Sequence, residues 1–204
     1  MNINSLKMKS FIFSIVIALV TVTGTSQAAQ AQTHHKEKRV KRHAARVHHR
    51  HRVVVRRAHI RYAHLPRWRA SVAVVPTSAV IIKTKTNPYY FDRGVYYTPR
   101  NNAYVVVRPV AGVRIRVLPV GYRRVVVGTR PYFYYYGTFY TQVDKSDEYE
   151  TIDAPEGAIV DALPEGYDVK KVDGTEYYVL DDVYYAEVET DEVEDGVGYE
   201  VVKI

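Results

Sequence analysis

From residue 88 onward, short apolar and aromatic runs alternate with pairs of turn-forming residues. The Val-rich and Tyr-rich runs favour β-strands. Gly128-Thr129 and Asp173-Gly174 separate such runs and are typical of type II′ and type I′ hairpin turns, and Arg93-Gly94 and Tyr136-Gly137 resemble them in position. No segment has the apolar period of an amphipathic helix. The pattern predicts an all-β antiparallel hairpin meander. Its predicted strands lie near 94–98, 104–108, 113–117, 122–127, 132–136, 138–143, 149–152, 158–162, 168–172, 176–180, 183–188 and 198–203.

The same region repeats itself. Tyr104-Val-Val-Val, Gly112 and Leu118-Pro-Val-Gly-Tyr each have a counterpart 45 residues later in the chain. Such self-similarity indicates duplicated supersecondary units that share a core. We expect about two and a half units, which span 88–130, 131–175 and, incompletely, 176–204. Within each Leu-Pro-x-Gly motif, Pro second and Gly fourth predict a type I turn.

Three segments carry a family resemblance. Gly-Val-Tyr-Tyr at 94–97, Val-Leu-Pro-Val-Gly-Tyr at 117–122 and the run from Val125 to Tyr140 occur in a fixed order and spacing. In this they resemble a family of exported bacterial proteins with a Tyr-rich β domain of unknown function. The resemblance covers about residues 88–204, implies export and a small β domain, and brings no catalytic residues.

Residues 1–31 read as a secretory signal peptide. Lys7 and Lys9 precede a short apolar run from Phe11 to Val22, and small residues follow it. Cleavage is expected after Ala28 or Ala31. A membrane-spanning helix needs about 20 apolar residues, so an uncleaved anchor is the less favoured alternative. We therefore expect export to the periplasm or outer cell envelope.

Residues 32–70 form a basic arm that contains all eight His residues and a single acid, Glu37. Like charges at this density repel one another, so we expect the arm to be disordered. Its Lys and Arg side chains suit an anionic envelope polymer or membrane surface, and an exported chain meets no intracellular nucleic acid. Residues 71–87 are expected to form a linker or short strands. The candidate polyanion-binding residues are Arg46, Arg50, Arg52, Arg56, Arg57 and Arg61.

The His residues of the arm suggest a metal site as an alternative. His48, His49 and His51 are the weak candidates, because neutral imidazoles bind zinc, nickel or copper. Arg50 and Arg52 place fixed positive charge beside them, and the spacing matches no closed tetrahedral site. We therefore expect no metal and no cofactor, and His serves as a pH-dependent extension of the polycation.

Charge divides the chain into two opposed halves. Residues 33–130 carry 23 Lys and Arg against two acids, a net charge of +21, and residues 131–204 carry four Lys against 20 acids, a net charge of −16. Pairing between the two halves is expected within one chain or between neighbouring molecules, and salt should weaken it.

Tyr accounts for 19 residues, far more than Phe or Trp. Tyr fits a pleated sheet while its hydroxyl reaches water, so a structural role is the first interpretation. A platform for stacking a glycan or peptide is the alternative. The candidate platform residues are Tyr132, Tyr134, Tyr136, Phe139 and Tyr140.

Catalysis finds little support in the sequence. The chain lacks Cys, a nucleophile elbow and a phosphate-binding Gly loop, and every His lies in the arm. We expect a non-enzymatic envelope protein with a polyanion-binding arm and a β scaffold. The alternatives are a glycan- or peptide-binding module that uses the Tyr hairpins and a periplasmic metal-binding protein that uses the arm.

Overall fold

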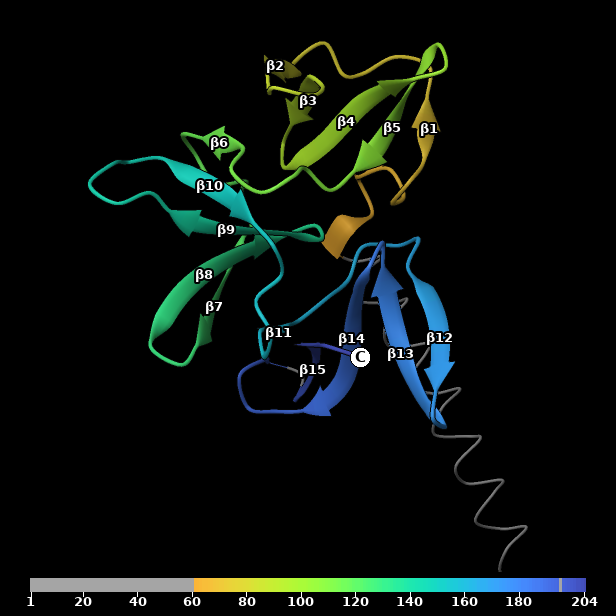
Figure 1. Ribbon diagram of the computed structural model, residues 1–204, viewed down its shortest axis with the longest axis vertical. Coiled ribbons are helices and arrows are strands. Elements are labelled where there is room, and N and C mark those ends of the chain that lie inside the picture. The colour runs from red at the N-terminus through yellow and green to blue at the C-terminus, as the bar shows by residue number, and fades with distance from the viewer. Residues whose placement is uncertain (1–60, 195) are drawn as a thin grey trace, which may run out of the picture. The chain divides into compact units, whose positions relative to one another are not determined.

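The computed structural model describes residues 61–194 and 196–204, which belong to one compact unit that spans Val53–Ile204. Within these residues, fifteen strands form three five-stranded antiparallel sheets. Figure 1 labels the strands. The expected all-β class with repeated hairpins is confirmed. The signal peptide, its cleavage site and the arm before residue 61 lie outside the described residues.

The three sheets have the same strand order. The first strand of each sheet pairs with the fifth, and the order then runs back through the fourth, third and second strands. The first sheet contains β1 (Ser71–Val72), β2 (Val80–Ile82), β3 (Tyr89–Asp92), β4 (Val95–Arg100) and β5 (Ala103–Val107). The second contains β6 (Arg114–Ile115), β7 (Arg123–Val127), β8 (Arg130–Tyr135), β9 (Thr138–Gln142) and β10 (Tyr149–Ile152). The third contains β11 (Ile159–Val160), β12 (Asp168–Val172), β13 (Thr175–Leu180), β14 (Val183–Glu189) and β15 (Val197–Val202).

The sequence repeats correspond to these sheets with an offset. The expected units begin at β3, β8 and β13, in the middle of a sheet rather than at its first strand. Residues 71–87 supply the short strands β1 and β2, which complete the first sheet. The third sheet is closed by β11 on β15. The second and third sheets therefore each combine strands from two consecutive sequence units, whereas the first combines strands from residues 71–87 with strands of the unit 88–130.

The hairpin turns have the expected backbone. Asp173 and Gly174 have φ angles of 47° and 84°, which fit a type I′ turn. In the other turn, Gly128 has a positive φ angle and Thr129 does not, as a type II′ turn requires. The Leu-Pro-x-Gly turn was predicted wrongly. The Tyr122 amide donates to the Pro119 carbonyl at 3.1 Å, so the turn starts at Pro119 and not at Leu118. Gly121 then occupies the third position with φ of 87°, which is type II geometry.

Tyrosine side chains build most of the core. Tyr96, Tyr134, Tyr140 and Tyr185 are at most 1% exposed. The Tyr89 ring stands edge-on to the Tyr96 ring. Two hydroxyls are bonded inside the core: Tyr134 donates to the Ala162 carbonyl at 3.0 Å, and Tyr140 donates to the Tyr96 hydroxyl at 3.3 Å. Tyr fills this core because its ring packs well, and the hydroxyls of Tyr134 and Tyr140 also find partners. The buried Tyr185 hydroxyl has no hydrogen-bond partner within the described residues.

Residues 61–70 correct the expected extent of the disordered arm. Tyr62 and Trp68 are each only 4% exposed and belong to the hydrophobic core. The Tyr62 ring stands edge-on to Tyr136, and the Trp68 amide donates to the Glu165 carbonyl at 2.7 Å. Packing removes the apolar surface of these two aromatic residues from water. The resulting stabilisation outweighs the repulsion between the Arg residues around them. This segment is drawn in orange in Figure 1.

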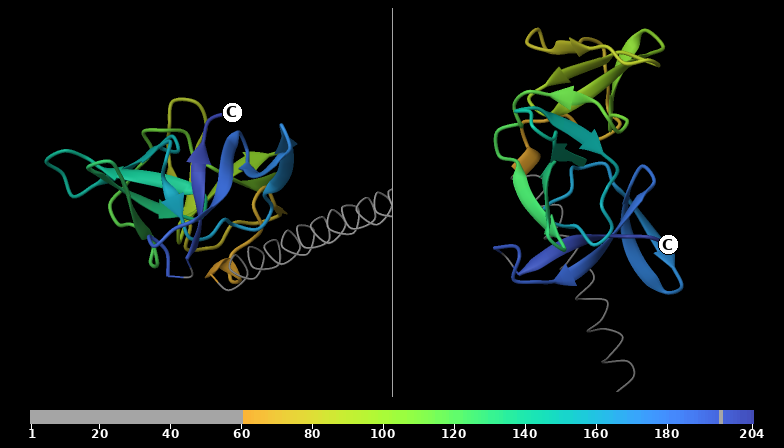
Figure 2. Two further views of the ribbon diagram at one scale, coloured as in Figure 1. Left: turned by 90° about the horizontal axis from the view of Figure 1, so that it is seen from below. Right: turned by 60° about the vertical axis from the view of Figure 1, so that its left-hand side comes forward.

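Hairpin tips join each sheet to its neighbour (Figure 2). Gly94, at the β3–β4 tip, lies against Pro119 and Tyr135 of the second sheet's segment. Gly137, at the β8–β9 tip, lies against Pro164, which precedes β12, and against Trp68. Close approach at both tips requires residues without a side chain.

The junction between the third sheet and the first consists of contacts to two aspartates. Asp181, at the β13–β14 tip, accepts from Trp68 Nε1 at 3.3 Å and from Arg69 Nε at 2.9 Å. Its neighbour Asp182 pairs with Arg108, which follows β5. The contacts of the three tips therefore run from the first sheet to the second, from the second to the third, and from the third back to the first.

Candidate functional site

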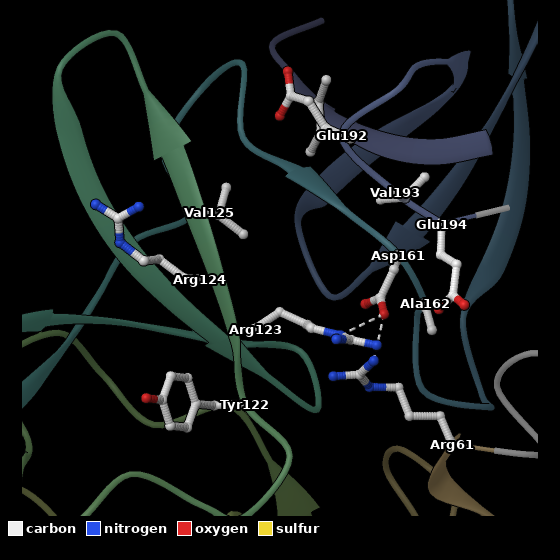
Figure 3. Close-up of a pocket in the computed structure, with 11 residues that line it drawn as sticks. Arg61, Tyr122, Arg123, Arg124, Val125, Asp161, Ala162, Glu192, Val193 and Glu194 are labelled. Atoms are coloured by element: carbon white, nitrogen blue, oxygen red, sulfur yellow. Dashed lines mark hydrogen bonds and ion pairs between the residues drawn. The ribbon is translucent and has the colours of Figure 1, made fainter. Parts of the chain in front are cut away.

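A charged cleft lies between the second and third sheets. Its volume is about 740 Å³, within the range of ligand pockets. One wall is β7 with Tyr122, and the other contains Ile159 of β11, Asp161, Ala162 and residues 192–194, which follow β14. Arg61 also lines the cleft. Figure 3 shows these side chains.

Two arginines share one carboxylate in this cleft. Arg123 Nε donates to Asp161 Oδ2 at 2.9 Å, and the Arg61 guanidinium donates to the same oxygen. Arg61 also donates to the Gly121 carbonyl at 2.6 Å. The pair of guanidiniums converges on Asp161 in Figure 3. We call these three residues the Arg-Asp-Arg triad; it carries one net positive charge.

The triad is incompletely bonded. Arg61 Nε and Asp161 Oδ1 are both buried and have no hydrogen-bond partner within the described residues. A buried unpaired polar atom is costly, and such atoms in native structures commonly mark a bound water, ion or ligand. The triad thus offers one spare donor and one spare acceptor beside a cleft.

The opposite wall of the cleft is acidic. Glu192 and Glu194 line it from the segment after β14, and both are exposed. Val193 lies between them, and the half-buried Ile159 adds apolar surface, whereas Val125 lines the other wall but is only 4% exposed. The cleft therefore presents positive charge at the triad, negative charge across from it and apolar surface between.

Tyr62 packs behind the triad. Burial raises the pKa of its hydroxyl far above the usual 10.0, with the nearby Arg61 acting in the opposite direction and Asp161 reinforcing the rise. Its oxygen accepts from the Tyr136 amide at 3.3 Å. The neutral phenol is a structural support here and is not poised to exchange a proton near neutral pH.

The structure places few of the expected site residues in the cleft. Arg61 lies in the triad, so it binds a carboxylate of its own chain. The other candidate polyanion residues, and His48, His49 and His51, lie outside the described residues. Within the described part of the chain, no group of His, Asp and Glu has the geometry of a metal site.

The expected Tyr platform does not form as an open surface. Tyr134, Tyr136, Phe139 and Tyr140 are at most 2% exposed, because their rings build the core between the sheets. Tyr132 alone among the five candidates is half-buried. For four of the five residues, the structural interpretation of the Tyr pattern is the one that the packing supports.

Sequence reasoning missed most of the cleft. Arg123 and Asp161 were counted only as parts of the basic and acidic halves. One signal was present: ion pairs between the halves were expected within one chain, and Arg61 pairs with an acid 100 residues away. The charge balance indicated that such pairs form, but it did not indicate which residues form them.

The described residues thus define an all-β repeat domain with a charged cleft between two of its sheets. The chain belongs to the DUF6515 family, a family of unknown function, which it matches over residues 24–204. This match confirms the expectation that the chain belongs to a family of unknown function. No curated protein and no solved structure matches the chain. Among the described residues, no helix has the length and apolar character needed to cross a membrane.

Proposed function

We propose that the protein is a non-enzymatic interaction protein of the cell envelope. After export, its basic arm binds an anionic envelope polymer or membrane surface, and the β domain serves as the scaffold that holds the arm. The charge distribution carries this proposal. Residues 33–60 contain ten Lys and Arg and one acid, whereas residues 61–204 contain 17 Lys and Arg and 21 acids.

Ion pairs of the domain support these separate roles, with the arm as the binding segment and the β domain as the scaffold. Arg61 and Arg69, which follow the arm directly, pair with Asp161 and with Asp168 and Asp181. Arg67 approaches Glu165 at 3.8 Å. These contacts tie residues 61–69 to the third sheet, so the arm is joined to a fixed point on the scaffold.

The arm should bind through counterion release. Each Lys or Arg that neutralises a phosphate or carboxylate releases condensed ions, which gives affinity without sequence recognition and a steep dependence on salt. By this reasoning the arm supplies attachment, and any selectivity for a partner belongs to the domain.

Sedimentation with lipid vesicles tests the proposal. The mature chain is mixed with vesicles of phosphatidylcholine that contain phosphatidylglycerol, across a salt series, and with vesicles of phosphatidylcholine alone. In the arm variant, Gln replaces the five arginines Arg46, Arg50, Arg52, Arg56 and Arg57. In the matched control, Gln replaces five exposed cations of the domain: Lys83, Arg100, Arg116, Arg130 and Lys171.

The unchanged chain and the control should bind the anionic vesicles and lose at least about tenfold in affinity between low and physiological salt. The arm variant should remain in the supernatant. Equal sedimentation of the arm variant and the control, or binding that salt does not weaken, would overturn the proposal.

A further inference from the structure

The cleft between the second and third sheets has features that the proposed function does not use. In the part of the chain that the structure describes, β7 pairs only with β8 and β11 pairs only with β15, so each is the edge strand of its sheet. An open edge presents unpaired backbone N–H and C=O groups, to which an extended peptide can add as a further strand.

The register shows which backbone groups face the open edge of β7. Val127 and Arg130 flank the two-residue turn, so they form a hydrogen-bonded pair, and the bonded pairs recur at every second residue. Val125 and Arg123 therefore direct their N–H and C=O groups toward β8. Arg124, between them, directs its own N–H and C=O groups away from β8.

The same reasoning applies to β11. The Val201 amide donates to the Ala158 carbonyl at 2.9 Å, and two residues further along the ladder Val160 pairs with Tyr199. Ile159, between the bonded positions, presents its backbone groups to the other side. Arg124 and Ile159 both line the cleft.

Side chains add charges of opposite sign to this edge. The Arg-Asp-Arg triad has one net positive charge and a buried donor without a partner, Arg61 Nε. Glu192 and Glu194 lie on the other wall. In Figure 3, Arg123 points toward Asp161, whereas the Arg124 side chain lies on the opposite side of β7.

We propose that this cleft binds a short extended peptide with a free carboxylate and a free ammonium group. The peptide pairs its backbone with Arg124 at the edge of β7. Its carboxylate accepts from the guanidiniums of Arg61 and Arg123, and its ammonium group lies near Glu192 and Glu194. The apolar side chain of Ile159, which is partly exposed, contacts the peptide between its two charged ends.

Charge complementarity favours a peptide over a simple anion. An anion attracted by the triad is repelled by the two glutamates, and a cation attracted by the glutamates is repelled by the two arginines. Only a ligand with both charges is favoured by both walls. Backbone pairing with an open edge further favours an extended peptide over a sugar.

The test uses the mature chain and the pentapeptide Ala-Thr-Val-Thr-Ala, which has one ammonium group, one carboxylate and residues that favour an extended backbone. Calorimetry measures its affinity, and backbone amide chemical shifts locate it. N-acetylated and C-amidated forms of the peptide serve as matched probes, because each lacks one charge. We expect saturable binding of the free peptide, shifts at Arg124 and Ile159, and an affinity at least about tenfold lower for either blocked form.

Variants test the two sets of contacts separately. Arg123→Gln and the double variant Glu192→Gln, Glu194→Gln should each weaken binding about tenfold. The matched controls are Arg130→Gln, on the same hairpin, and the pair Asp147→Asn, Glu176→Gln, which lies outside the cleft lining; both should bind as the unchanged chain does. All variants must retain the melting temperature of the unchanged chain, since the substituted side chains are exposed.

Position 124 separates backbone pairing from charge. Arg124→Gln removes the charge and keeps the N–H, so it should bind almost normally. Arg124→Pro also removes the N–H, which faces away from β8 and is not needed by the sheet, and it should abolish binding. Absence of saturable binding at about 1 mM peptide, equal affinity for a blocked peptide, or equal effects of Gln and Pro at position 124 would overturn the proposal.

Discussion

The junction between the first two sheets depends on Gly94, and an alanine substitution there tests this directly. A Cβ atom at Gly94 would lie 2.4 Å from both Cδ1 and Cε1 of Tyr135 and 2.8 Å from Cβ of Pro119. These distances are far shorter than van der Waals contact. Because Tyr135 is 5% exposed and Pro119 is also buried, neither ring can move aside into solvent.

Gly174 provides a matched control. It occupies the same position of a type I′ turn, with φ of 84° against 89° for Gly94, but a Cβ atom there would meet nothing within 4 Å. Both alanine variants carry the penalty of a left-handed backbone, about 1–2 kcal/mol. Only Gly94→Ala adds the penalty of overpacking, about 1–3 kcal/mol. We therefore expect losses of about 1–2 kcal/mol at Gly174 and about 2–5 kcal/mol at Gly94.

Urea unfolding of the mature chain, followed by circular dichroism and tyrosine fluorescence, measures both free energies of unfolding. The difference between the two variants isolates the contact between the hairpin tip and the second sheet, since the backbone penalty is shared. Equal losses in Gly94→Ala and Gly174→Ala would refute the inference that this tip is packed against Pro119 and Tyr135.

Three further predictions concern buried polar groups and charge. Thr151→Val should lower the free energy of unfolding by about 1–3 kcal/mol, because the buried Thr151 hydroxyl accepts from the Val113 amide and donates to the Val110 carbonyl; an unchanged urea midpoint would contradict it. Asp181→Ala should lower stability by about 1 kcal/mol at low salt and by less at high salt, measured by the same assay at two salt concentrations. Burial raises the pKa of Tyr134 and Tyr140 far above 10.0, so stability should stay level below pH 10 and fall above it, as unfolding titrations across alkaline pH would show.

Local sequence patterns predicted most of the strands. Each of the twelve predicted strands overlaps an observed one, and the Asp-Gly and Gly-Thr turns have the expected backbone. Hairpins are predictable because strand propensity and turn chemistry both act over a few residues. Pairing of the first strand with the fifth was not predicted, because β6 and β11 contain only two residues each and pair with strands far along the chain.

The composition of the basic arm did not indicate that the two aromatic residues of segment 61–70 are buried. Tyr62 and Trp68 lie among arginines, and an average over the basic arm treats them as minor exceptions. Their burial depends on partners more than 60 residues away, such as Tyr136 and Glu165. The cleft was missed for a related reason: Arg61, Arg123 and Asp161 meet only when two separate sheets are packed together.

The three hairpin tips show how one repeated unit was adapted to three different neighbours. Gly94 and Gly137 occupy the second turn position at the first two tips, where a proline and an aromatic ring press against the backbone. The corresponding residue at the third tip is Asp182, and its neighbour Asp181 has φ of 56°, a conformation that Asp tolerates.

The reason for this change lies in the partner of the third tip. The segment before β1 brings the Trp68 indole N–H and the Arg69 guanidinium to this tip, and Arg108 approaches from the end of β5. Acceptors are needed there, and glycine supplies none beyond its backbone. Of the three hairpin tips in the described residues, this one alone makes ion pairs with the neighbouring sheet, so salt screens the contacts of this tip. The same junction holds residues 61–70, through which the basic arm joins the domain. Rising salt should therefore weaken the contacts of the third tip with Trp68 and Arg69 and, under the proposed function, also the binding of the arm to an anionic partner.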